Sequence, residues 1–148
     1  MRGSATQKVT YDSTHRYAVD PNRRVQMPLA WRPAKPIEFT MIVWPQGPCL
    51  RVLPPEEMEK LRAQVANLPT TPEKTLLKRH IGSASARVSL DSAKRLAIPA
   101  EMAEEVGIRD EALFAGVLDY FEIWPPDRYK ETKTLQKSDL SRAIQLLE

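Results

Sequence analysis

VDPNRRVQMP, at residues 19–28, has a counterpart 71 residues further along the chain, LDSAKRLAIP at residues 90–99. A second pair keeps the same offset, because LRVLPP at residues 50–55 aligns with FEIWPP at residues 121–126. The aspartate, the arginine and three prolines are identical, and the apolar positions keep their places. One offset held across both blocks indicates an internal duplication. Copies of such a unit usually pack together to bury their apolar faces.

Each copy of this stretch predicts a strand, a tight polar turn and a second strand that ends at a proline. Apolar residues alternate with polar ones on both sides of each turn, which is the period of a half-buried strand. These residues are Tyr17, Val19, Val25 and Met27 in the first copy, and Val88, Leu90, Leu96 and Ile98 in the second.

The rest of the chain predicts further strand pairs and short helices, so the expected fold class is α+β and β-rich. Strand pairs are expected over 39–44 and 50–53, and over 112–117 and 120–124. Helices are expected over 99–106 before Gly107, over 56–68, over 73–80 after a Thr71 cap, and over 139–147 after a Ser138 cap. In the first copy, prolines within 31–36 weaken the counterpart of the 99–106 helix.

These elements suggest five segments. Residues 1–7 are expected to be a leader or disordered tail, 8–70 the first repeat, 71–82 a helical linker, 83–137 the second repeat, and 138–148 a C-terminal helix.

Composition narrows the function classes. The chain has 148 residues, a formal net charge of +3 and one cysteine, Cys49, so an intrachain disulfide and a thiolate metal cluster are excluded. No stretch approaches the roughly 20 apolar residues that cross a bilayer. We therefore expect a cytoplasmic protein with no membrane partner, no metal and no cofactor. The mild positive charge permits nucleic-acid binding without requiring it.

The paired residues Asp20/Arg24 and Asp91/Arg95 are the first candidates for function. An aspartate that opens a turn accepts backbone N–H bonds and fixes the loop. An arginine four residues later either pairs with that carboxylate or projects outward as a planar fork. Such a fork can form two hydrogen bonds to phosphate or to guanine O6 and N7. The alternative is a purely structural ion pair in each turn.

Further basic residues accompany both motifs. Arg23 and Lys94 directly precede the motif arginines, and Arg16 and Arg87 lie on the incoming strands. If the two turns share a face, these residues form a basic stripe suited to a polyanion. The alternative is that they are solvated surface charges.

These motifs resemble the MraZ family, whose two turns have the form Asp-x-x-x-Arg followed by apolar-x-apolar-Pro. Similar blocks occur at Pro48–Leu50, at Leu76–Arg79 before Gly82 and at Phe121–Trp124, and the resemblance runs from about Tyr11 to Tyr129. It implies two fused repeats in an AbrB-like swapped-hairpin β-barrel with short flanking helices. It further implies a nucleoid-associated, ring-shaped homo-oligomer that binds short direct DNA repeats upstream of the division and cell-wall gene cluster. By matching positions, the family's DNA-recognition motif falls on Asp20, Arg24, Asp91 and Arg95.

One departure concerns the residue before each motif arginine, which is usually glycine in the family and is Arg23 or Lys94 here. If that glycine serves a positive φ, a long side chain is strained there. Asn22 can take over such a conformation in the first copy, whereas Ala93 is a poor substitute in the second. The alternative is that the glycine has no conformational role.

Other candidates point away from catalysis. Nothing places His15 or His80 near a carboxylate, so both are interpreted as surface or packing histidines. Cys49 is expected to be a small buried hydrophobe, and the three tryptophans are expected in the core. No phosphate loop, nucleophile motif or metal-ligand spacing is present in the sequence. The alternative to a DNA-binding regulator is a protein-interaction module whose basic turns bind an acidic partner.

Overall fold

A computed structural model describes residues 8–148, so the leader expected at residues 1–7 lies outside the described part. The fold is α+β, as predicted, and its strands pair antiparallel. The strands are β1 (Thr14–Ala18), β2 (Arg24–Gln26), β3 (Phe39–Trp44), β4 (Cys49–Leu53), β5 (Ser85–Val88), β6 (Arg95–Ala97), β7 (Glu111–Gly116) and β8 (Phe121–Trp124). The helices are α1 (Pro55–Ala66), α2 (Pro72–Ser83), α3 (Ala100–Val106), α4 (Pro126–Leu135) and α5 (Lys137–Ile144), with 3₁₀ turns η1 (Leu29–Trp31) and η2 (Gln145–Leu147).

The two copies interlock through their strands. Six strands form one sheet in the order β1-β7-β8-β4-β3-β5, and β2 and β6 form a separate two-stranded ribbon. The first strand of each copy pairs with the hairpin of the other copy, as β1 on β7 and β5 on β3. The strands on either side of each Asp-x-x-x-Arg turn therefore pair with other strands and not with each other. In the described residues β1 and β5 are free sheet edges, so the expected closed barrel is not formed.

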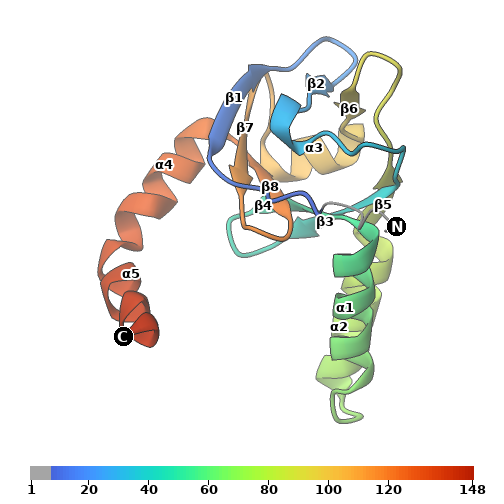
Figure 1. Ribbon diagram of the computed structural model, residues 1–148. Coiled ribbons are helices and arrows are strands. Elements are labelled where there is room, and N and C mark those ends of the chain that lie inside the picture. Colours follow the sequence, from blue (N-terminus) through green and yellow to red (C-terminus); the bar gives the residue numbers. More distant parts are fainter. Residues whose placement is uncertain (1–7) are drawn as a thin grey trace, which may run out of the picture.

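The core lies between the ribbon and one face of the large sheet. Alternation along β3 and β4 sends Phe39, Met41 and Val52 to this inner face, as expected for strands with two distinct sides. The ribbon, η1 and α3 cover the inner face, and Trp31 of η1 is fully buried there. Figure 1 shows the ribbon on one side of the sheet, with the α1–α2 hairpin and the α4–α5 arm projecting on the other side.

Most helix ends lie where the sequence predicts them. Thr71 accepts a hydrogen bond from the Lys74 backbone N–H at 3.2 Å and so caps α2, and Gly107 ends α3 with a φ of 82°. The Ser138 cap is wrong, because α5 begins at Lys137, directly after Gln136, without a side-chain cap. The repeated Pro-Pro pair begins α1 in the first copy and α4 in the second, so both copies start a helix at the equivalent position. No described helix is both long and apolar enough to cross a membrane.

Candidate nucleic-acid interface

The β2–β6 ribbon presents the motif arginines on its outer face. Val25 pairs with Leu96 at its centre, and both side chains are buried in the core. Because neighbouring strand residues point to opposite faces, Arg24 and Arg95 point away from the core. Their cross-strand partners are Ala97 and Gln26. The structure thus brings the two motif arginines together on one short antiparallel ribbon.

Each aspartate builds its turn in the same way. The Asp20 Oδ1 atom accepts hydrogen bonds from the backbone N–H groups of Asn22 and Arg24, both at 2.8 Å. The Asp91 Oδ1 atom accepts from Ala93 and Arg95, both at 2.9 Å. The predicted role of the aspartates in shaping the turns is therefore confirmed.

The left-handed positions are those of Arg23 and Lys94, with φ values of 60° and 64°. Asn22 does not take over this conformation, so the expected compensation in the first copy is wrong. The family's glycine position needs a positive φ, and an L-residue there costs about 1–2 kcal/mol. The carbonyls of the two strained residues accept hydrogen bonds from the other copy, from Ile98 N–H to Arg23 (2.9 Å) and from Met27 N–H to Lys94 (3.2 Å). These cross-copy bonds help to hold the strained conformations in place.

One arginine joins both carboxylates. The Arg95 side chain donates through Nε to Asp91 Oδ2 at 3.1 Å, and its Nη1 lies 3.7 Å from Asp20 Oδ2. The side chains of all three residues are about one third exposed. Hydrogen bonding from the Arg95 backbone lowers the pKa of Asp91, and the charge and side chain of Arg95 lower it further. Within residues 8–148, no ion pair is formed by Arg24.

The remaining two basic candidates lie elsewhere. Arg16 pairs with Leu113 and Arg87 pairs with Thr40, and these positions belong to the sheet face opposite the ribbon. The structure therefore does not bring Arg16 and Arg87 into the ribbon surface. Gln26, which the sequence reasoning did not select, is on that surface. Strand alternation from Arg24 was the signal that could have identified it.

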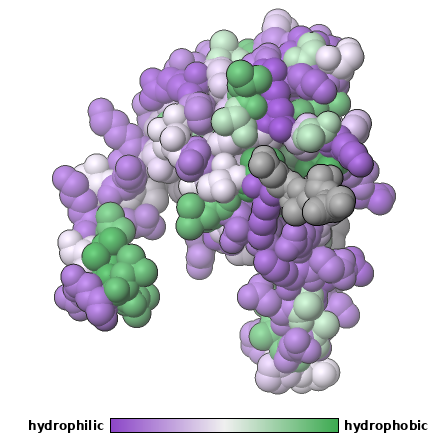
Figure 2. Space-filling view, viewed as in Figure 1, coloured by the Kyte–Doolittle hydropathy of each residue, from purple (hydrophilic) through white to green (hydrophobic). Residues whose placement is uncertain are grey.

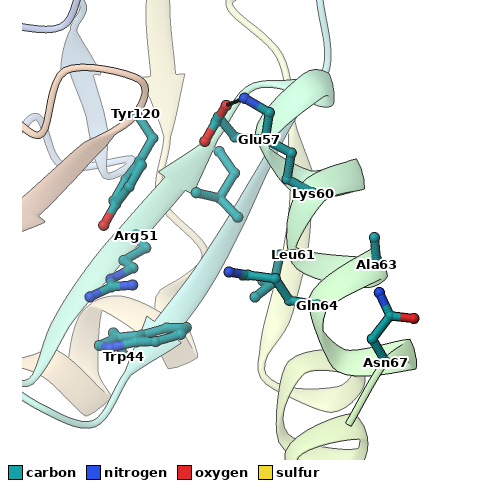
Figure 3. A pocket seen from close by; sticks show the side chains of 10 residues that line it. Trp44, Arg51, Glu57, Lys60, Leu61, Ala63, Gln64, Asn67 and Tyr120 are labelled. Carbon is teal, nitrogen blue, oxygen red and sulfur yellow. Dashed lines mark ion pairs between the residues drawn. The ribbon is translucent and has the colours of Figure 1, made fainter.

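A separate cleft of about 430 Å³ lies between the sheet and α1 (Figure 3). Arg51 stacks on Trp44 there, with its guanidinium carbon 3.8 Å from the ring centre, and pairs with Glu122 at 3.3 Å. Lys60 pairs with Glu57 at 3.0 Å on the α1 side of the same cleft. Because both cations already have carboxylate partners, this cleft is a poorer anion site than the ribbon.

Among the other sequence candidates, Trp31 and Trp124 are buried as expected, whereas the expectation for Trp44 is wrong, because it is half-buried and lines the cleft beside α1. Burial raises the pKa of the Cys49 thiol, which makes it a poor nucleophile at neutral pH. The His80 Nε2 atom lies 2.7 Å from the Val43 carbonyl and joins α2 to β3. The described residues contain no group of three or more His, Cys, Asp or Glu side chains that could hold a metal ion.

The fold and the ribbon define a two-repeat α+β protein with two adjacent turns of Asp-x-x-x-Arg type. Comparison with known proteins identifies the family. The profile of the family described as "MraZ protein, putative antitoxin-like" matches residues 83–145. "Transcriptional regulator MraZ" of Roseiflexus sp. is 31% identical over 134 residues, which cover 90% of this chain and 93% of the relative. The chain therefore belongs to the MraZ family.

Two further relatives have the same name. The protein of Xanthomonas oryzae pv. oryzae is 32% identical over 131 residues, which cover 82% of this chain and 88% of the relative. That of Lachnoclostridium phytofermentans is 29% identical over 116 residues, which cover 78% of this chain and 82% of the relative. The similarity thus includes both copies of the repeat.

Proposed function

We propose that the protein is a DNA-binding transcriptional regulator that reads its operator with the outer face of the β2–β6 ribbon. The observation that carries this proposal is the pair of outward-facing arginines, Arg24 and Arg95, on a ribbon of two short strands. A two-stranded ribbon fits the major groove of B-DNA. An arginine fork suits guanine there and Gln26 suits adenine.

The two strained basic residues add positive charge beside this surface, with the Lys94 side chain toward the phosphates and Arg23 bonded to the Ile98 carbonyl, and Asp20 and Asp91 shape the turns. We also propose, because the chain belongs to the MraZ family, that its sites are short direct repeats upstream of the division and cell-wall gene cluster and that the protein is associated with the nucleoid. We also propose that the functional repeats are residues 8–70 and 83–137, joined by the linker 71–82 and followed by the helix 138–148. No catalytic step or cofactor is part of this function.

Several protomers must act together, because one ribbon with three outward polar side chains reads only a short sequence. Linking sites in one assembly raises the effective concentration of the second and later contacts. Exposed apolar side chains on the α4–α5 arm support such an assembly. They are Leu135, Leu140, Ile144, Leu146 and Leu147. Figure 2 shows the apolar surface that they form at the end of the arm. We propose that this surface is buried between copies in a ring-shaped homo-oligomer.

Selection of bound duplexes from a random pool at physiological salt tests the proposal. We expect a motif that recurs at a regular spacing. Replacement of both Arg24 and Arg95 by Ala should abolish retention of the selected duplex. The matched control replaces Lys78 and Arg79 of α2, which removes the same charge far from the ribbon and should leave specific retention. Equal retention by all three proteins, or recovery of an acidic protein and no DNA, would refute the assignment.

A further inference from the structure

The two Asp-x-x-x-Arg turns are equivalent in sequence but not in their contacts. Asp20 and Asp91 each use Oδ1 for the turn, which leaves Oδ2 for a cation. Arg95 lies against both Oδ2 atoms, at 3.1 Å from Asp91 and 3.7 Å from Asp20. Arg24 forms no side-chain hydrogen bond or ion pair with any residue in 8–148. The first aspartate is thus paired with the arginine of the second turn.

Arg23 and Lys94, which precede the motif arginines, show the opposite difference: within the described residues, the side chain in the first turn is bonded to the other copy and that in the second turn is not. The Nε of Arg23 donates to the Ile98 carbonyl of the other copy at 3.1 Å. The Lys94 ammonium has no partner of that kind among the described residues. Each turn therefore contains one basic side chain that joins the copies and one that is left for a ligand.

Charge gives a physical reason for this division. The two carboxylates lie on either side of the pseudo-twofold axis, and one guanidinium between them is close enough to attract both. A second guanidinium in the same place would meet the first at close range, where like charges repel. Only one of the two motif arginines can occupy the place, so the other is displaced to the outer surface.

We propose that Arg24 and Lys94 are the side chains that contact DNA, whereas Arg95 and Arg23 are positioning residues that hold the two turns together. The inference rests on the proposed function, and it assigns one DNA-contacting side chain to each copy of the repeat. A reading surface with one contacting arginine has a direction along the DNA. Such a protomer binds its site in one orientation, which suits repeats that run in the same direction.

Single variants Arg24→Gln, Lys94→Gln, Arg95→Gln and Arg23→Gln test the division by two independent measurements. The first is the salt dependence of binding to a duplex that the wild-type protein selects from a random pool. Arg24→Gln and Lys94→Gln should each lower the slope of log affinity against log salt by about one. Arg95→Gln and Arg23→Gln should keep the slope, even where the affinity falls because the turns are less well held.

The second measurement needs no DNA. Arg95→Gln should lower the Tm by about 2–4 °C and raise the pKa of Asp91, followed by carbon NMR of its carboxyl group. Arg24→Gln should change neither quantity, and Arg95→Lys, which can still pair with one carboxylate, should restore part of the Tm. Equal changes in slope for Arg24→Gln and Arg95→Gln, or an unchanged Asp91 pKa in Arg95→Gln, would overturn the division. Failure of the wild-type protein to retain any duplex would instead refute the DNA-binding function and, with it, the contact role of Arg24. The Tm and the pKa would still decide the positioning role of Arg95.

Discussion

Val25 and Leu96 occupy equivalent positions in the two copies and face each other across the β2–β6 ribbon, with 1% and 0% of their surfaces exposed. Arg51 and Glu122, also equivalent by the 71-residue offset, face each other across β4 and β8. The pseudo-twofold axis therefore runs through both pairs. The ribbon is attached to the sheet at this axis, so the position of its outer face depends on the apolar contact beneath it.

Loss of that contact should weaken the whole fold. Leu96→Ala removes a fully buried side chain, and we expect the free energy of unfolding to fall by about 2–5 kcal/mol. Urea unfolding followed by circular dichroism gives the value. Ala97→Ser, on the exposed face of the same strand, is the control and should stay within about 0.5 kcal/mol of the original. A loss in the control as large as that in Leu96→Ala would contradict the placement of the ribbon.

Relief of backbone strain at the second turn should stabilise the protein. Lys94 has a φ of 64°, and its side chain forms no bond within the described residues. Lys94→Gly should unfold with a free energy about 1 kcal/mol higher than Lys94→Ala, because glycine alone accepts this conformation without strain. Both variants lose the same charge, so their affinities for DNA should have the same salt slope. Equal stability of the two variants would show that position 94 is not strained.

Measurements of stability at acidic pH should reveal how much the charge of Asp91 contributes to folding. Its pKa is lowered in the folded state, so its ionised form stabilises the fold at pH values above the ordinary value of 3.8. That contribution is lost as the pH falls through the lowered pKa. Asp91→Asn keeps an oxygen acceptor for the turn, so its deficit in stability should be present at neutral pH and shrink in acid. Asp91→Ala lacks the acceptor and should remain less stable at every pH. A constant deficit in Asp91→Asn would contradict the ion pair.

The sequence contains the duplication, the strand faces and the turns, because these depend on short-range patterns. Alternation correctly places Val25 and Leu96 in the core, and Thr71 and Gly107 mark real helix ends. The alternation of apolar and polar residues identifies a strand and its buried face, but it does not show with which other strand it pairs. The pairing of β1 with β7, and of β2 with β6, therefore could not be predicted from it.

The details of the site depend on contacts between the copies. The positive φ falls on Arg23 and Lys94, whose carbonyls bond to the other copy, although residue preference alone favours Asn22. The ion pair between Arg95 and Asp20 joins residues 75 positions apart and belongs to no local motif. Gln26 was overlooked because it has no counterpart in the second copy, where Ala97 takes its place.

The apolar end of the arm should control assembly and, through it, the affinity for repeated sites. Leu140 and Ile144 are one turn apart on α5 and are 57% and 48% exposed, so a charge at these positions should leave the protomer folded. Leu140→Glu with Ile144→Glu should reduce the mass measured by light scattering. It should also lower the affinity for a tandem operator by about 10²-fold or more, with little effect on a single site. Ser138→Glu with Gln145→Glu adds the same charge on the side of the helix opposite Leu140 and Ile144, and should retain both the mass and the affinity. An unchanged mass in the first variant would show that copies associate through another surface.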